Sequence, residues 1–275
     1  MILVNGDELK ADTGIFPNGE VKIKEPFIMG VGLVTVTLKW ESDQDLINLM
    51  FLKEYLDLHP DIETELVVLY MPYSRMDRKI LGDLFTLKSV CRMINAMHFI
   101  TVTVCEPHSD VTTALLDRCK VRDLTMEIFR DHENTIKPDY VFYPDAGAQK
   151  RYHTKRYPNL VGHKVRNPQT GRIEKYGVLG VDAFKWQFEN GATKFPTIAI
   201  LDDLSSYGNT FIHAAKALKE MGAGDIYLIV AHAEKAIFKG DIFTSGLFKK
   251  VLTSNSIIDI KDGKGFNDII IEDIY

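Results

Sequence analysis

Short apolar runs alternate along the chain with segments whose apolar residues recur at helical spacing. The runs that predict strands cover residues 33–38, 66–70, 99–104, 140–143, 197–201 and 226–231. Helical spacing predicts helices over residues 45–59, 81–97, 112–117 and 211–221. Alternation of strands and helices is typical of parallel sheets joined by right-handed crossovers. The pattern therefore predicts an α/β protein with parallel sheets.

A polar stretch at residues 130–134, Arg-Asp-His-Glu-Asn, separates two such series. The 275 residues are enough for two domains of about 130 residues each. We therefore expect an N-terminal α/β domain over residues 1–135 and a C-terminal α/β domain over residues 136–256. Ligands of such sheets bind beyond the carboxyl ends of the strands, so residues just after each strand are the functional candidates.

Composition limits the class of protein, the partners and the cellular compartment that we expect. Hydrophobic residues make up 45% and charged residues 26%, which is ordinary for a globular protein, and the net charge is −5. A negative balance argues against nucleic acid or an anionic membrane as partner. The N-terminus lacks the features of a signal peptide, and no apolar stretch reaches the roughly 20 residues that span a bilayer. Cys91, Cys105 and Cys119 show no metal-binding spacing and indicate reduced thiols, so we expect a cytoplasmic protein.

The segment Leu-Asp-Asp-Leu-Ser-Ser-Tyr-Gly-Asn-Thr, residues 201–210, joins a predicted strand to a predicted helix. Asp202 and Asp203 point to different sides of an extended chain, so one can face a ligand while the other supports the loop. Adjacent acids suit the vicinal hydroxyls of a sugar, directly or through Mg²⁺. The groups that suit an anion are the start of the helix, with Ser205, Ser206, Gly208 and Thr210. An ordinary helix cap is the alternative, since Ser, Asp and Asn precede many helices.

Three further strand ends carry reactive side chains. Arg75 and Arg78 flank Asp77, which suits a polyphosphate clamp braced by an internal acid, or else a solvated surface turn. His108 follows the next strand and suits a metal, a phosphate or a proton shuttle, although a lone histidine is more often structural. Asp145 follows a third strand, where it can hold Mg²⁺ or belong to an ordinary strand-to-helix turn.

A basic loop lies between the two halves of the predicted C-terminal domain. Pro-Gln-Thr-Gly at residues 168–171 predicts a hairpin tip, and Lys164 and Arg166 share one side of an extended backbone. A lid with two cations would stabilise charge that develops in phosphoryl-type transfer. The alternative is an exposed basic hairpin.

Together these segments resemble the ribose-phosphate diphosphokinases, the phosphoribosyl pyrophosphate synthetases, in the family's order from about residue 14 to 256. Phe-Pro-Asn-Gly-Glu at 16–20 resembles F-S-D-G-E, and Tyr-Ser-Arg-Met-Asp-Arg at 73–78 resembles Y-A-R-Q-D-R. Pro-Asp-Ala-Gly at 144–147 resembles P-D-x-G, while Lys164 and Arg166 fit the K-x-R pair of the flexible loop. Residues 202–210 resemble D-D-x-x-D-T-G-G-T. The resemblance implies two tandem phosphoribosyltransferase-like domains, with residues 257–275 rejoining the first.

The resemblance also implies an activity and a set of roles. In this family the C1 hydroxyl of ribose 5-phosphate attacks the β-phosphorus of Mg-ATP and AMP leaves, so the protein supplies positioning and charge neutralisation. The implied catalytic residues are Lys164, Arg166 and His108. The implied ATP contacts are Phe16, Asn18, Glu20, Arg75, Asp77, Arg78 and His108. The implied Mg²⁺ contacts are His108 and Asp145. The implied ribose-phosphate contacts are Asp202, Asp203, Ser205, Ser206, Tyr207, Gly208, Asn209 and Thr210. We expect a homo-oligomer.

The chain departs from the family pattern in three segments, and the loop at residues 206–210 is the most informative of them. Asn18 and Met76 replace an acid and a glutamine, and D-T-G-G-T becomes Ser-Tyr-Gly-Asn-Thr at residues 206–210. Tyr207 either packs the loop or stacks on a nucleotide attached beyond the 5-phosphate. The rival acceptor is therefore ADP-ribose, as in a variant of the family described in phages, whose product a nicotinamide phosphoribosyltransferase-like partner would convert to NAD. A phosphoribosyltransferase fits less well, because it does not need residues 73–78 or the Lys164 and Arg166 pair. A non-catalytic regulatory homologue of the synthetases fits less well, because the chain retains His108, Asp145, Lys164 and Arg166.

Overall fold

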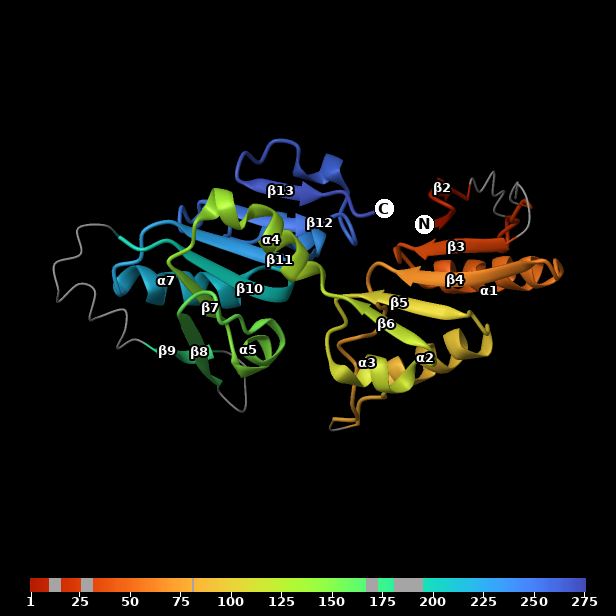
Figure 1. Ribbon diagram of the computed structural model, residues 1–275, viewed down its shortest axis with the longest axis horizontal. Coiled ribbons are helices and arrows are strands. Elements are labelled where there is room, and N and C mark those ends of the chain that lie inside the picture. Colours follow the sequence, from red (N-terminus) through yellow and green to blue (C-terminus); the bar gives the residue numbers. More distant parts are fainter. Residues whose placement is uncertain (10–15, 26–31, 81, 167–172, 181–194) are drawn as a thin grey trace. The chain divides into compact units, whose positions relative to one another are not determined.

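The computed structural model describes residues 1–9, 16–25, 32–80, 82–166, 173–180 and 195–275, which form two compact units (Figure 1). The first unit comprises Met1–Asp123 with Tyr275, and the second comprises Leu124–Ile274. Each unit is built on a sheet of mostly parallel strands, which confirms the predicted fold class. Among the described residues no helix is long and apolar enough to cross a membrane.

The first unit contains a six-stranded sheet in the order β2-β1-β3-β4-β5-β6. Strands β3 to β6 pair in parallel, whereas β1 is antiparallel to both β2 and β3. The strands are β1 Ile2–Val4, β2 Asp7–Glu8, β3 Gly32–Leu38, β4 Ile62–Val68, β5 Thr101–Cys105 and β6 Cys119–Arg122. The helices are α1 Asp43–Asp57, α2 Thr86–Ala96 and α3 Asp110–Leu115. Helix α2 begins five residues after the predicted start, because Gly82 adopts φ +98° and Leu84 is exposed.

The second unit contains a seven-stranded sheet in the order β13-β12-β11-β10-β7-β8-β9, parallel except for β9. Its strands are β7 Tyr140–Tyr143, β8 Asn159–Arg166, β9 Ile173–Leu179, β10 Ile198–Ser205, β11 Ile226–Ala233, β12 Lys250–Ser254 and β13 Ile269–Glu272. Its helices are α4 Leu124–Ile136, α5 Ala146–Tyr152 and α7 Asn209–Glu220, with short 3₁₀ helices η1 Lys235–Lys239 and η2 Ile260–Gly263. Residues of β7 are buried on both faces, as in a sheet covered on each side.

The boundary between the units lies before α4 and not at the polar stretch inside it. Helix α4 buries Leu124, Ile128 and Phe129 and contacts β10, β11 and β12, so its apolar side binds it to the second sheet. The polar stretch at 130–134 is the outer part of that helix. The C-terminal segment also differs from the expected return to the first domain. Strand β13 pairs with β12 from Val251↔Ile269 to Ser254↔Glu272, because its three isoleucines complete an edge of the second sheet.

Candidate functional site

The first unit places an acid–arginine pair after the end of β4. The Arg78 guanidinium donates to both carboxylate oxygens of Asp77, with Nε–Oδ1 2.7 Å and Nη2–Oδ2 3.1 Å. Asp77 is buried at 5% exposure, whereas the Arg78 side chain is 67% exposed. Hydrogen bonding by Arg78 lowers the pKa of Asp77 against the effect of burial, and the charge of His108 acts in the same direction. The structure therefore brings Asp77, Arg78 and His108 together, and the acid fixes the orientation of an exposed cation.

The segment that carries this pair is anchored to α1. Tyr73 has a left-handed φ of +62°, and its hydroxyl donates to Asp43, 2.8 Å from each carboxylate oxygen. This hydrogen bond raises the pKa of Tyr73. The Trp40 ring lies 6.2 Å from the Tyr73 ring. A strained backbone held by several contacts is typical of functional loops, and the sequence pattern did not single out Tyr73 for this role.

The end of β5 has a second strained residue. Glu106 has φ +47° and is buried at 2% exposure, and its N–H donates to the Arg122 carbonyl at 2.9 Å. This turn leads to His108, which is half-buried. Arg75 is exposed. The predicted roles of His108 and Arg75 toward ATP stay predictions.

Residues 16–20 form an exposed turn. The Phe16 N–H donates to the Glu20 carbonyl at 2.8 Å, and the Glu20 N–H donates to Asn18 Oδ1 at 3.2 Å. Gly19 has φ +92°, as such a turn requires. The Phe16 ring is 51% exposed. The turn thus presents an aromatic ring to solvent, and its assignment to adenine stays a prediction.

In the second unit the acid pair lies inside β10 and not after it. Pairing of β10 with β11 continues to Ser205↔Ala233, four residues beyond the predicted strand end. The Asp203 N–H donates to Asp202 Oδ1 at 3.0 Å. Arg151 of α5 forms an ion pair with Asp203, with Nη1–Oδ2 3.3 Å. Side chains alternate between the two faces of a regular strand, and the placement of the two carboxylates on different sides stays a prediction.

The loop after the acids is held by close backbone packing. Gly208 has φ +83° and precedes α7, and a Cβ added there would lie 2.2 Å from Ile242 Cδ1. A Cβ added at Gly240 would lie 2.0 Å from the Tyr207 carbonyl oxygen. The Tyr207 ring, by contrast, is 52% exposed. The backbone of this loop is therefore fixed while its aromatic side chain faces solvent.

The start of α7 combines this loop with polar groups. Asn209 and Thr210 occupy the first turn, so their backbone N–H groups lie at the positive end of the helix dipole. Ser205 is fully buried, and within the described part of the chain its hydroxyl has no hydrogen-bond partner. Ser206 is half-buried. This arrangement is typical of an anion site at a helix N-terminus.

Asp145 caps helix α5. Its Oδ1 accepts hydrogen bonds from the N–H groups of Gly147 and Ala148, each at 3.0 Å. The cap and the predicted Mg²⁺ contact are compatible, because Mg²⁺ commonly binds one or two carboxylates and completes its shell with waters and phosphates. Over the described ranges no three His, Cys, Asp or Glu side chains gather to hold a metal ion by themselves. The Mg²⁺ contact at Asp145 stays a prediction.

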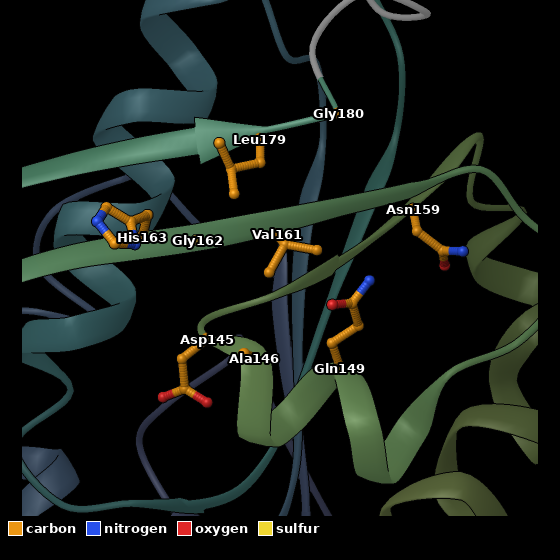
Figure 2. A pocket seen from close by; sticks show the side chains of 9 residues that line it. All are labelled: Asp145, Ala146, Gln149, Asn159, Val161, Gly162, His163, Leu179 and Gly180. Carbon is orange, nitrogen blue, oxygen red and sulfur yellow. The ribbon is translucent and has the colours of Figure 1, made fainter.

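A pocket of about 540 Å³ lies between α5 and the β8–β9 hairpin (Figure 2). Figure 2 shows that Gln149 extends from α5 toward β8. Asp145 and His163 lie at the end of the pocket that is nearest the start of α5. The residues that line the pocket are Asp145, Ala146, Gln149, Asn159, Val161, Gly162, His163, Leu179 and Gly180. The pocket thus adjoins the strand that carries Lys164.

The predicted hairpin forms from β8 and β9, with Lys164 opposite Tyr176 and Arg166 opposite Ile173. The predicted tip at 168–171 and the side chains of Lys164 and Arg166 lie outside the described part of the structure. The backbone places both cations on β8, and their catalytic role stays a prediction.

Tyr176 joins the base of this hairpin to the β7–α5 turn. Its hydroxyl donates to the Pro144 carbonyl at 3.2 Å. Burial raises the pKa of Tyr176, and the nearby charges of Asp145 and Asp202 raise it further. A Cβ added at Gly162 would lie 2.3 Å from the Tyr176 hydroxyl and 2.5 Å from the Pro144 carbonyl. Sequence reasoning missed Tyr176 and Arg151, since only the folded sheet brings them to the acids.

Comparison with known proteins gives a consistent result, although no family model matches the chain. The ribose-phosphate pyrophosphokinase of Sulfurisphaera tokodaii is 25% identical over 256 residues, which covers 90% of this chain and 85% of the relative. That of Methanothermobacter thermautotrophicus is 25% identical over 268 residues, covering 91% and 86%. The crystal structure of phosphoribosylpyrophosphate synthetase from Mycobacterium smegmatis matches with a TM-score of 0.71 and 20% identity, covering 95% of this chain and 85% of that chain.

Proposed function

We propose that this chain, like the ribose-phosphate pyrophosphokinases to which it is similar, transfers the pyrophosphoryl group of Mg-ATP to the C1 hydroxyl of ribose 5-phosphate. The C1 oxygen forms a bond to the β-phosphorus, the bond from that phosphorus to the α–β bridging oxygen breaks, and AMP leaves. The products are phosphoribosyl pyrophosphate and AMP.

The observation that carries the proposal is the acid pair on β10 followed by the start of α7. A carboxylate held by Arg151 and a second held by a backbone N–H suit the ribose hydroxyls, and the helix N-terminus suits the 5-phosphate. The pair of Asp77 with Arg78 would orient a cation toward the phosphates of ATP. Asp145 would contribute to the Mg²⁺ that accompanies ATP, and that ion would neutralise charge on the phosphates.

Lys164 and Arg166 would act on the charge that develops during transfer. Their position on β8, beside the pocket that contains Asp145, supports this role. A cation that meets the reacting phosphates mainly in the transition state raises turnover more than it raises affinity.

The direct test is release of AMP from ATP with ribose 5-phosphate as acceptor. We expect AMP in proportion to the phosphoribosyl pyrophosphate formed, and none when the acceptor is omitted. ATP consumption that yields ADP, or no consumption in the presence of Mg²⁺, would contradict the proposal.

A second candidate acceptor is ADP-ribose, and the exposed ring of Tyr207 favours it. The ring is 52% exposed and lies just before the helix start that would hold the 5-phosphate, so it can stack on a nucleobase attached beyond that phosphate. The product would be ADP-ribose 1-pyrophosphate, which a nicotinamide phosphoribosyltransferase-like enzyme would convert to NAD. AMP release with both acceptors at equal concentration decides between them.

A further inference from the structure

The pairing of β10 with β11 is interrupted beside the acid pair. The register runs through Asp202↔Val230 and resumes at Leu204↔His232, so Asp203 and Ala231 form no ladder pair. In a parallel pair the N–H groups of alternate residues donate to carbonyls of the neighbouring strand. The Ala231 N–H and the Asp202 carbonyl face this interruption.

A threonine hydroxyl from α4 fills the gap. The Ala231 N–H donates to Thr125 Oγ1 at 3.0 Å, and Thr125 Oγ1 donates to the Asp202 carbonyl at 2.9 Å. Thr125 is fully buried, so water does not compete for these bonds. The hydroxyl therefore relays a hydrogen bond between two strands that would otherwise close on each other.

Two more hydroxyls hold the other side of Ala231. Its carbonyl accepts from Ser254 Oγ at 2.6 Å and from Thr253 Oγ1 at 3.4 Å. Side-chain hydroxyls thus bind both the N–H and the carbonyl of Ala231. These contacts hold β10 and β11 apart at this point.

We propose that Thr125 is a positioning residue for the sugar acceptor, because its hydroxyl separates β10 from β11 and thereby sets the direction of the Asp202 and Asp203 carboxylates. The inference rests on the proposed function, in which these acids hold the ribose hydroxyls. Asp202 is then fixed at its carbonyl by Thr125 and at its carboxylate by the Asp203 N–H, while Arg151 fixes Asp203. Without the hydroxyl, the strands would close to a direct bond and rotate the acids away from the sugar.

The test compares Thr125→Val, which keeps the shape and removes the hydroxyl, with Thr125→Ser, which keeps the hydroxyl. Thr125→Val should raise KM for the acceptor about tenfold, because carboxylates turned away from the sugar lose about one hydrogen bond to it, and leave KM for ATP unchanged. Thr125→Ser should restore the acceptor KM to within about twofold of the wild type. If Thr125→Val fails to fold, Thr125→Cys replaces it, since a thiol has similar size and is a weak donor.

Thr112 of α3 supplies a matched control. It is fully buried in the first unit, and its hydroxyl has no hydrogen-bond partner among the described residues. Thr112→Val should leave both KM values unchanged. The inference is overturned if Thr125→Val has a wild-type acceptor KM, or if both KM values rise together while the melting temperature falls, since that is the result of a purely structural role.

Failure of the proposed function has a separate signature. Wild-type AMP release is measured first, and its absence rejects the activity without using any variant. Calorimetric titration of ribose 5-phosphate into the wild type and both Thr125 variants then tests the inference directly. Weaker binding in Thr125→Val than in Thr125→Ser supports it, whereas equal binding or no binding to the wild type rejects it.

Discussion

Each unit contains a buried aspartate paired with an arginine. The two pairs differ in the exposure of the arginine and in how far apart the partners lie in sequence. In the first unit Asp77 and Arg78 are neighbours in sequence, and the arginine side chain is 67% exposed. In the second unit Asp203 lies on β10, and its partner Arg151 comes from α5 with a side chain that is 28% exposed. An acid that orients an exposed arginine prepares a cation for an anionic ligand. An arginine that holds an acid in a strand prepares a carboxylate for a polar ligand.

Under the proposed function, this contrast would match the two pairs to different substrates. The first suits the phosphates of ATP and the second suits the hydroxyls of a sugar. Variants of each pair should therefore affect different kinetic constants, and charges that belong to neither pair should affect turnover.

The largest effect is expected where a cation acts outside both pairs. Lys164→Ala and Arg166→Ala should each lower kcat by on the order of 10²–10³, by analogy with the loss of other preorganised groups that stabilise a transition state. KM for ATP should change little, because such charges act mainly in the transition state. Steady-state kinetics with both substrates measures this. Near wild-type kcat in the double variant would exclude the hairpin from the mechanism.

The contrast itself is tested by removing one arginine at a time. Arg151→Met should raise KM for the acceptor about ten- to a hundredfold, since it leaves the carboxylate of Asp203 without its partner in a partly buried site. Arg78→Met should instead raise KM for ATP about tenfold, because a phosphate contact is lost. The measurement is the full matrix of both KM values for both variants. A rise in the same KM for both would show that the two pairs serve one substrate.

Tyr207 tests whether the proposed sugar site extends beyond the 5-phosphate. If its ring stacks on a base, Tyr207→Ala should weaken binding of ADP-ribose by about 1–3 kcal/mol and leave ribose 5-phosphate nearly unchanged. Tyr207→Phe is the matched control, since it keeps the ring. Calorimetry with each acceptor separates the two. An equal loss for both, or a fall in melting temperature without a change in binding, would assign the ring to packing.

The smallest effect is expected on the stability of the fold at low pH, through the pair of Asp77 and Arg78. The pKa of Asp77 is lowered in the folded state, so its ionised form stabilises the fold above the unfolded value of about 3.9. That contribution is lost as the pH falls from there through the lowered folded-state pKa. The melting temperature of the wild type should consequently exceed that of Asp77→Asn at pH 7, with a difference that shrinks below about pH 4. A difference that grows on acidification would contradict the sign of the shift.

Much of the fold was predictable because strands and helices here follow their apolar spacing. The strand starting at Tyr140 and the helix after Gly208 were both predicted. The extent of β10 was not predictable, because Asp202 and Asp203 break its apolar run and only pairing with β11 keeps them in the strand. The edge strand β13 differs from what the resemblance implies for residues 257–275, because it pairs with β12 in the second sheet.

The candidate site residues also fall into those that a local motif indicates and those that only the folded sheet brings together. Asp77, Asp145 and the acid pair could be selected as candidates because each lies in a local motif, and their roles stay predictions. Thr125, Arg151 and Tyr176 could not be, since their partners lie 32 or more residues away in sequence and meet them only in the folded unit. A helix start, an arginine in a short helix and a tyrosine in a hairpin carry no local sign of these contacts.

The packing of Tyr207 and Gly208 against Gly240 and Ile242 has a practical consequence for engineering. Since the backbone there is fixed by two glycines while the side chain at 207 points to solvent, position 207 can be randomised without remodelling the loop. A saturation library at this one codon, screened with acceptors that differ only beyond the 5-phosphate, would turn the loop into an exchangeable selectivity element.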